Sequence, residues 1–94
     1  MVAYAMVHID VNDAEKYVKY AELAGPAVVK YGGEFLARGG ECFHMEGKGR
    51  SRNVIIRFKD METAKSFYHS PEYQEALSYG LPAADREYTF VEGV

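Results

Sequence analysis

The first segment of the chain restricts its fold more than any other feature. Val2 to Ile9 is a continuous apolar run with β-branched and aromatic members, bounded by Asp10 and Asn12. A run of this kind predicts a β-strand that is covered on both faces. Its side chains divide between the faces, with Ala3, Ala5, Val7 and Ile9 on one and Tyr4, Met6 and His8 on the other. The fold must therefore supply a covering layer for each face.

After this strand the apolar residues recur every three or four positions, which predicts an amphipathic helix that begins near Ala14. Asn12 followed by Glu15 resembles a capping box at its start. Gly25-Pro26 is expected to kink or restart this helix because proline removes a backbone hydrogen bond. Gly32-Gly33 is expected to end it.

Two further strands are predicted in the middle of the chain. Glu34–Arg38 predicts the second strand, with a bulge or bend at Gly39-Gly40 and a continuation through Cys42 to Glu46. The apolar residues of Asn53–Phe58 predict the third strand. The polar, glycine-rich segment Gly47–Ser51 is expected to join the two strands as a hairpin.

The last third of the chain predicts two short helices and one strand. Asp60 is a suitable N-cap for the first helix, and Ser70-Pro71 begins the second, with serine as cap and proline in the first turn. Arg86 to Val91 alternates as a fourth strand. The order β-α-β-β-α-β predicts an α+β, ferredoxin-like sandwich with the first and third strands central. The 94 residues suit a single domain over 1–94.

The predicted helices cover only one face of a four-stranded sheet, although the first strand is apolar on both. A second copy of the chain, packed sheet to sheet, is the simplest cover for the other face, so a homodimer is expected. By strand parity that face also collects polar side chains, namely Arg38, Arg57, Glu87 and Thr89. These groups predict a partly wet cleft that could hold a small molecule.

The charge balance excludes some partners and locations. Lysine and arginine number 11 against 14 acidic residues, which gives a net charge of −3 without a basic stripe, so no nucleic-acid partner is expected. No apolar stretch approaches the roughly 20 residues of a membrane span, and the N-terminus has no basic region, so no membrane association is expected. The lone Cys42 agrees with a reducing compartment, and a cytoplasmic location is predicted.

Several segments together resemble a known family. They are Tyr31–Gly40, Glu46-Gly47, Phe67–Gln74 and Val91–Val94, and the match runs over essentially the whole chain. They resemble domain-of-unknown-function family 1330, a member of the dimeric α+β barrel superfamily. The resemblance implies a ferredoxin-like subunit that pairs into a barrel-like dimer, and it implies no established activity. Relatives elsewhere in that superfamily include cofactor-free monooxygenases, lactone isomerases, chlorite-type haem enzymes and ligand-binding modules.

Histidines are the candidate catalytic residues. His8, His44 and His69 show no short ligand spacing, so neither a metal site nor a bound cofactor is predicted. His44 lies beyond the glycine bend, where a strand end is expected to meet the cleft, and His69 precedes a helix start, where anions are favoured. Both are therefore candidate proton-transfer groups, although His69 could simply belong to a helix cap.

Four residues are candidates for substrate binding. Arg38 ends a strand before two glycines, and its guanidinium could bind a carboxylate through two hydrogen bonds, or it could form a structural salt bridge. Arg57 is predicted on the same face. Ser70 and Tyr73 flank the start of the second of the two short helices. Ser70 could instead serve only as a helix cap, and Tyr73 could instead belong to the core.

Neither composition nor motifs name a reaction. One hypothesis is an enzyme that works without a cofactor on a small oxygenated or carboxylated metabolite, with His44 or His69 as the base and Arg38 orienting the substrate. A second is a non-catalytic ligand-binding or sensor module. A third is a structural dimer whose polar face is only an interface network.

Overall fold

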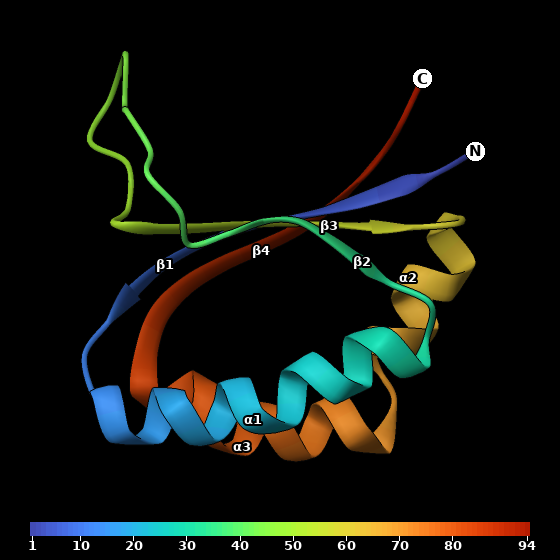
Figure 1. The fold of residues 1–94 in the computed structure, drawn as a ribbon, viewed down its shortest axis with the longest axis horizontal. Helices are drawn as coiled ribbons and strands as arrows, with labels where there is room; N and C mark the ends of the chain where they lie inside the picture. Colours follow the sequence, from blue (N-terminus) through green and yellow to red (C-terminus); the bar gives the residue numbers. More distant parts are fainter.

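The computed structural model describes residues 1–94, and its elements follow the predicted order (Figure 1). They are β1 (Ala3–Val11), α1 (Ala14–Lys30), β2 (Glu34–Arg38), β3 (Arg52–Phe58), α2 (Met61–Tyr68), α3 (Pro71–Ala83) and β4 (Ala84–Glu92). The four strands form one antiparallel sheet in the order β2-β3-β1-β4. This confirms the ferredoxin-like α+β prediction with β1 and β3 at the centre. None of the helices is long and apolar enough to cross a bilayer.

The helices cover one face of the sheet and leave the other open (Figure 1). On the covered face, Ala3, Ala5, Val7 and Ile9 are buried, as the alternation of β1 predicts. Phe58, Phe67 and Tyr73 fill the space between the layers, with ring centroids 4.5 Å apart for Phe67 and Tyr73. The side chains of Tyr4, Met6 and His8 on the open face are only half-buried.

Helix α1 departs from its prediction at the N-cap. Its N-cap is Asp13, whose carboxylate accepts a hydrogen bond of 3.1 Å from the backbone N–H of Lys16. Asn12 lies one residue before the cap, and the backbone N–H groups of Asn12 and Asp13 both donate to the carbonyl of Ala83, at 2.7 and 3.0 Å. The helix also continues through Pro26 without a restart. Burial of neighbouring turns against the core holds the helix together where proline removes one hydrogen bond.

The predicted continuation of the second strand through Cys42 to Glu46 is wrong. Residues 39–51 form an exposed loop that rises on the open side of the sheet (Figure 1). Pairing with β3 ends at Arg38 opposite Val54, and β3 begins at Arg52, so residues 42–46 have no neighbouring strand. Strands β2 and β3 nevertheless pair antiparallel, as predicted for a hairpin.

The chain bends at Gly39, as predicted, and β2 has a further irregularity at Leu36 that was not predicted. Phe35 is opposite Ile56 and Ala37 is opposite Ile55, so one extra residue is accommodated between them. An extra residue shifts every later side chain of the strand to the other face. Arg38 therefore lies opposite the buried Val54, on the helix-covered side, and the predicted place of Arg38 on the open face is wrong.

The other polar residues assigned to the open face lie where parity places them. Arg57 is opposite Tyr4, Glu87 is opposite His8, and Thr89 is opposite Met6. The open face of the monomer therefore carries a mixture of half-buried apolar groups and charged groups. The separation of Arg38 from Arg57 divides the predicted substrate-binding residues between two faces of the sheet.

Candidate functional site

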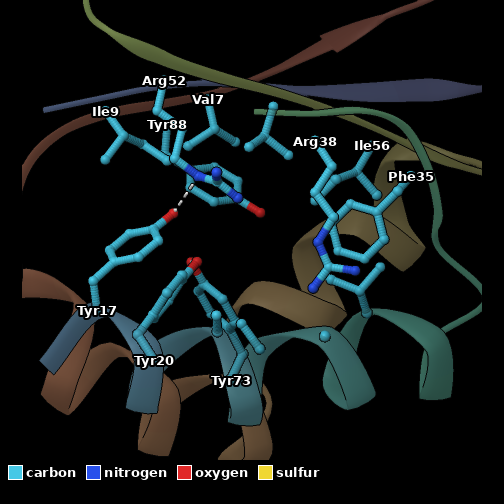
Figure 2. A pocket seen from close by; sticks show the side chains of 15 residues that line it. Val7, Ile9, Tyr17, Tyr20, Phe35, Arg38, Arg52, Ile56, Tyr73 and Tyr88 are labelled. Carbon is cyan, nitrogen blue, oxygen red and sulfur yellow. Dashed lines mark hydrogen bonds between the residues drawn. The ribbon is translucent and has the colours of Figure 1, made fainter. Parts of the chain in front are cut away.

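A cavity of about 40 Å³ lies between α1 and the covered face of the sheet (Figure 2). Apolar side chains from β1, β3 and α1 make most of its wall. Aromatic rings and two arginines complete it. The lining residues are Val7, Ile9, Tyr17, Tyr20, Ala21, Ala24, Gly25, Val28, Phe35, Arg38, Arg52, Val54, Ile56, Tyr73 and Tyr88.

The polar side chains around this cavity are all arginines or tyrosines. No aspartate, glutamate, histidine, amide or aliphatic hydroxyl side chain lines it. A guanidinium only donates hydrogen bonds, whereas a phenol both donates and accepts. The side chains of the cavity therefore present many donors and few acceptors.

One polar cluster joins three elements at one end of the cavity. Nη2 of Arg86 on β4 donates to the hydroxyl of Tyr20 on α1 at 2.7 Å and to that of Tyr73 on α3 at 3.0 Å. The two hydroxyls are 2.8 Å apart and share a further hydrogen bond. The guanidinium of Arg86 also lies over the Tyr20 ring, 4.6 Å from its centroid. Its Nε is buried without a hydrogen-bond partner.

Glycine and serine on α3 set the positions of these two tyrosines. A Cβ added at Gly80 would lie 2.5 Å from Cδ1 of Tyr20, so only glycine leaves room for this ring. The hydroxyl of Ser70 donates to the carbonyl of Phe67 at 2.7 Å and accepts from the backbone N–H of Tyr73 at 3.1 Å. Ser70 is therefore a buried helix cap that fixes the first turn of α3, from which Tyr73 projects.

The two arginines of the wall come from neighbouring strands. Nε of Arg52 donates to the hydroxyl of Tyr17 at 3.1 Å. The Arg52 guanidinium lies where a side chain at Gly39 would be, because a Cβ added there would be 2.1 Å from Nη1 of Arg52. The φ angle of Gly39 is +72°, which also favours glycine. Arg38 stacks on the Phe35 ring, 4.0 Å from its centroid, and extends toward Gly25 of α1 (Figure 2).

No carboxylate neutralises the arginines around the cavity. The ion pairs of the chain are Lys30–Glu72, Arg50–Asp10, Arg50–Glu87 and Arg57–Glu34. Arg38, Arg52 and Arg86 thus have no acidic oxygen within 4.0 Å. Two guanidinium groups without counter-ions, those of Arg38 and Arg52, line one small cavity, and that of Arg86 binds two of its tyrosines, in a chain whose net charge is −3.

Burial keeps the tyrosines of this site protonated. Desolvation is the main cause that raises the pKa of Tyr20, Tyr73 and Tyr88 above the usual value for a phenol. For Tyr73, the charge of Arg86 acts in the opposite direction and only partly offsets the effect of burial on the pKa. At neutral pH these phenols are therefore hydrogen-bond donors and not bases.

The structure distributes the predicted binding residues over different places. Arg38 and Tyr73 both line the cavity, and Ser70 supports Tyr73 from behind. Arg57 lies on the open face of the sheet, where its Nη1 is 3.7 Å from a carboxylate oxygen of Glu34. The cavity therefore brings together two of the four residues and leaves Arg57 apart.

Neither predicted catalytic histidine lines the cavity. His44 is exposed in the loop over residues 39–51, and its Nε2 donates to the carbonyl of Arg50 at 2.9 Å. His69 is the exposed C-cap of α2 and borders a shallow surface depression with Tyr68 and Tyr88. Tyr88 is shared between this depression and the cavity. No cluster of three or more metal-binding side chains occurs in the chain.

The sequence reasoning missed Tyr17, Tyr20, Arg52, Arg86 and Tyr88. A usable signal existed in α1, where Tyr17 and Tyr20 are three residues apart and therefore share a helix face. A second signal existed in β4, where Arg86 and Tyr88 point to the same face as the buried core. A charged residue on an otherwise apolar face indicates a partner or a ligand.

The chain matches the family model described as "Domain of unknown function (DUF1330)" over residues 2–94. A protein of unknown function from Rhodopseudomonas palustris has a similar structure, with a TM-score of 0.79, 17% identity, and coverage of 99% of this chain and 82% of that one. A dimeric ferredoxin-like protein of unknown function from Jannaschia sp. CCS1 gives a TM-score of 0.80, 12% identity, and coverage of 99% and 100%.

An enzyme is also among the similar structures. SnoaB, a cofactor-independent oxygenase from Streptomyces nogalater, gives a TM-score of 0.68 at 8% identity, with coverage of 99% of this chain and 93% of its own. No curated protein matches the chain. At these identities the similar structures support the fold alone.

The raised pKa values of Tyr20, Tyr73 and Tyr88 predict an abnormal alkaline titration. Because ionisation is less favourable in the folded state, their contribution to stability is complete below the unfolded pKa of about 10 and is lost as pH rises above it. Ultraviolet absorbance should show fewer of the eight tyrosines ionised near pH 10 in the folded protein than in urea. Ionisation of all eight near pH 10, with native circular dichroism retained, would contradict this assignment.

Proposed function

Because the chain belongs to the DUF1330 family, whose description assigns no activity, we propose its function from the cavity: the protein binds a small anionic molecule between α1 and the sheet. One observation carries this proposal. Arg38 and Arg52 line the cavity, Arg86 binds two of its tyrosines, and none of the three has an acidic partner. An anionic ligand would supply the missing negative charge.

Arg38 is exposed, so charge and hydrogen-bond geometry, and not desolvation, favour an anion there. A guanidinium pairs best with a carboxylate or phosphate, which accepts two parallel hydrogen bonds. Arg38 has its guanidinium at the cavity and no competing acid, so it is the group best placed to meet such a ligand. Phe35 holds the Arg38 guanidinium by stacking and leaves the hydrogen-bonding edges free.

The chemistry of the wall supports binding more than cofactor-independent catalysis. An enzyme without a cofactor must move protons with its own side chains. The cavity holds protonated phenols and guanidinium groups, which donate hydrogen bonds but do not take up protons at neutral pH. His44 and His69 are exposed and outside it, so the proposal assigns them no catalytic role. A ligand-binding module is therefore the favoured function.

We also propose that the open face of the sheet packs against a second copy of the chain. Tyr4, Met6 and Ile55 give this face an apolar centre that no helix covers. The loop over residues 39–51 rises on the same side and carries Phe43 and Met45, which are 78% and 89% exposed. The similar structure from Jannaschia is described as dimeric, which supports this assembly.

Substitution of Arg38 tests the ligand role. A melting-temperature screen with small carboxylates should find ligands that stabilise the wild type. Arg38→Ala should weaken their binding about 10-fold or more, and Arg38→Lys should weaken it as well because the two-point geometry is lost. Since Arg38 is exposed and has no ion pair, the free energy of unfolding without ligand should change by less than about 0.5 kcal/mol.

Two other substitutions serve as comparisons for Arg38. Lys59→Ala removes an exposed positive charge outside the cavity and should leave binding unchanged. Arg57→Ala tests the open face directly. If Arg57→Ala abolished binding while Arg38→Ala did not, the ligand would belong to the sheet face and the proposal would be wrong.

The dimer is tested by a charge on the open face. Light scattering at micromolar concentration should give about twice 10.6 kDa for the wild type. Met6→Asp should give a folded monomer because an unpaired carboxylate would be desolvated between two sheets. Val18→Asp places the same charge at an exposed apolar position of α1 and should keep the dimer. A monomeric wild type, or a dimeric Met6→Asp variant, would contradict the assembly.

A further inference from the structure

We infer that the ligand is a short aliphatic acid with a second oxygen acceptor near its carboxylate, such as a 2-oxo or 2-hydroxy acid. This inference rests on the proposed anion-binding function and deepens it. Three features carry it: the size of the cavity, the surplus of hydroxyl hydrogens at one end, and the separation of that end from Arg38.

The cavity is too small for a ring. Its volume of about 40 Å³ compares with roughly 10–15 Å³ for one water molecule and about 150 Å³ for a cavity that holds benzene. The space therefore holds about three water molecules or the body of a short chain. A ligand with an aromatic ring would have to displace the wall formed by α1 and the sheet.

A count of hydrogens at the Tyr20–Tyr73 pair leaves one hydroxyl hydrogen unused. The two phenols own two hydroxyl hydrogens, and the bond between them uses one. The bonds to Arg86 use hydrogens of the guanidinium, so both hydroxyl oxygens accept there. Tyr88 brings one more hydroxyl hydrogen and one more side-chain hydrogen bond, to Tyr73, so one hydrogen among the three phenols remains available. All three phenols line the cavity, so this hydrogen is a donor for a ligand oxygen.

Arg86 strengthens this donor. A phenol that accepts a hydrogen bond from a cation becomes more polarised and donates its own hydrogen more strongly. Burial, meanwhile, raises the pKa of both tyrosines, so the hydrogen is not lost at neutral pH. Tyr17 provides a further hydrogen of the same kind because its oxygen accepts from Arg52.

The two groups of donors lie at different sides of the cavity. Figure 2 shows Arg38 with Phe35 and Ile56 on one side, and the hydroxyls of Tyr17, Tyr20 and Tyr73 on the other. Ala24 and Val54 belong to the apolar wall of the cavity. A ligand with a carboxylate at Arg38 and one more oxygen toward the phenols satisfies both groups, whereas a simple fatty acid leaves the phenol hydrogen without an acceptor.

Calorimetric titration with a matched series tests the ligand class. The probes are propanoate, 2-oxopropanoate, 2-hydroxypropanoate and benzoate, with the full-length chain. The two oxygenated acids should bind the wild type about 3- to 10-fold more tightly than propanoate, as expected for one added hydrogen bond. Benzoate should bind more weakly than either of them.

Variants locate the second oxygen. Tyr20→Phe/Tyr73→Phe removes the two hydroxyls that bind Arg86, and the preference for the oxygenated acids over propanoate should decrease, because only Tyr17 and Tyr88 then keep hydroxyls at the cavity. Tyr79→Phe removes a hydroxyl outside the cavity and should leave that preference unchanged. If the double variant does not fold, the preference of the wild type within the series still decides the inference.

The outcomes separate this inference from the proposed function. Equal binding of propanoate and the oxygenated acids, or tighter binding of benzoate, with loss of binding in Arg38→Ala, would overturn the inference and keep the anion site. An undiminished preference in a folded double variant would also overturn it. Absence of binding for every acid in the series would overturn the anion site itself.

Discussion

The hydrogen bonds of Arg86 to Tyr20 and Tyr73 are the interaction on which the rest of the site depends. One guanidinium nitrogen on an edge strand connects to two phenols on two different helices, so β4, α1 and α3 meet at a single point. Fully buried Tyr73 and nearly buried Tyr20 could not leave their hydroxyls without partners at low cost. The cluster satisfies both hydroxyls and leaves a space beside them, which becomes the cavity.

This arrangement decides what the cavity can bind. The cluster brings positive charge into the interior without a carboxylate, and Arg38 and Arg52 add two more guanidinium groups at the wall. A set of donors with no acidic partner favours a ligand that accepts hydrogen bonds and carries negative charge. The same set contains few groups that take up protons. It therefore favours the binding of an acid over catalysis of its reaction. The similarity in fold to a cofactor-independent oxygenase does not by itself bring the chemistry of that enzyme.

The fold was largely predictable because its determinants are periodic and local. The apolar alternation of β1, the helical spacing after Ala14 and the caps at Asp60 and Ser70 each act over a few residues, and the structure contains all of these elements. The predictions were wrong where another residue or a missing strand partner determined the local structure. Asp13 displaced Asn12 as the cap of α1, and residues 42–46 had no strand to pair with.

The site was less predictable because one inserted residue changes the face of a side chain. Strict alternation along β2 predicts that Arg38 lies on the open face. The extra residue at Leu36 places Arg38 on the helix-covered face, where it lines the cavity. No residue type at Leu36 marks this event, since it arises from how β2 pairs with β3. The Tyr20–Tyr73–Arg86 cluster also joins residues 53 and 66 positions from Tyr20, and such long-range contacts leave no spacing pattern in a single sequence.

In the proposed function the cavity, and not the open face of the sheet, receives an anion at Arg38. Side-chain nuclear magnetic resonance tests this most directly, because each arginine Nε–H gives its own signal and Arg57 serves as an internal control on the open face. Titration with 2-oxopropanoate should shift the signals of Arg38 and Arg52 and leave that of Arg57 in place. A shift confined to Arg57, or no shift at any arginine, would contradict the account.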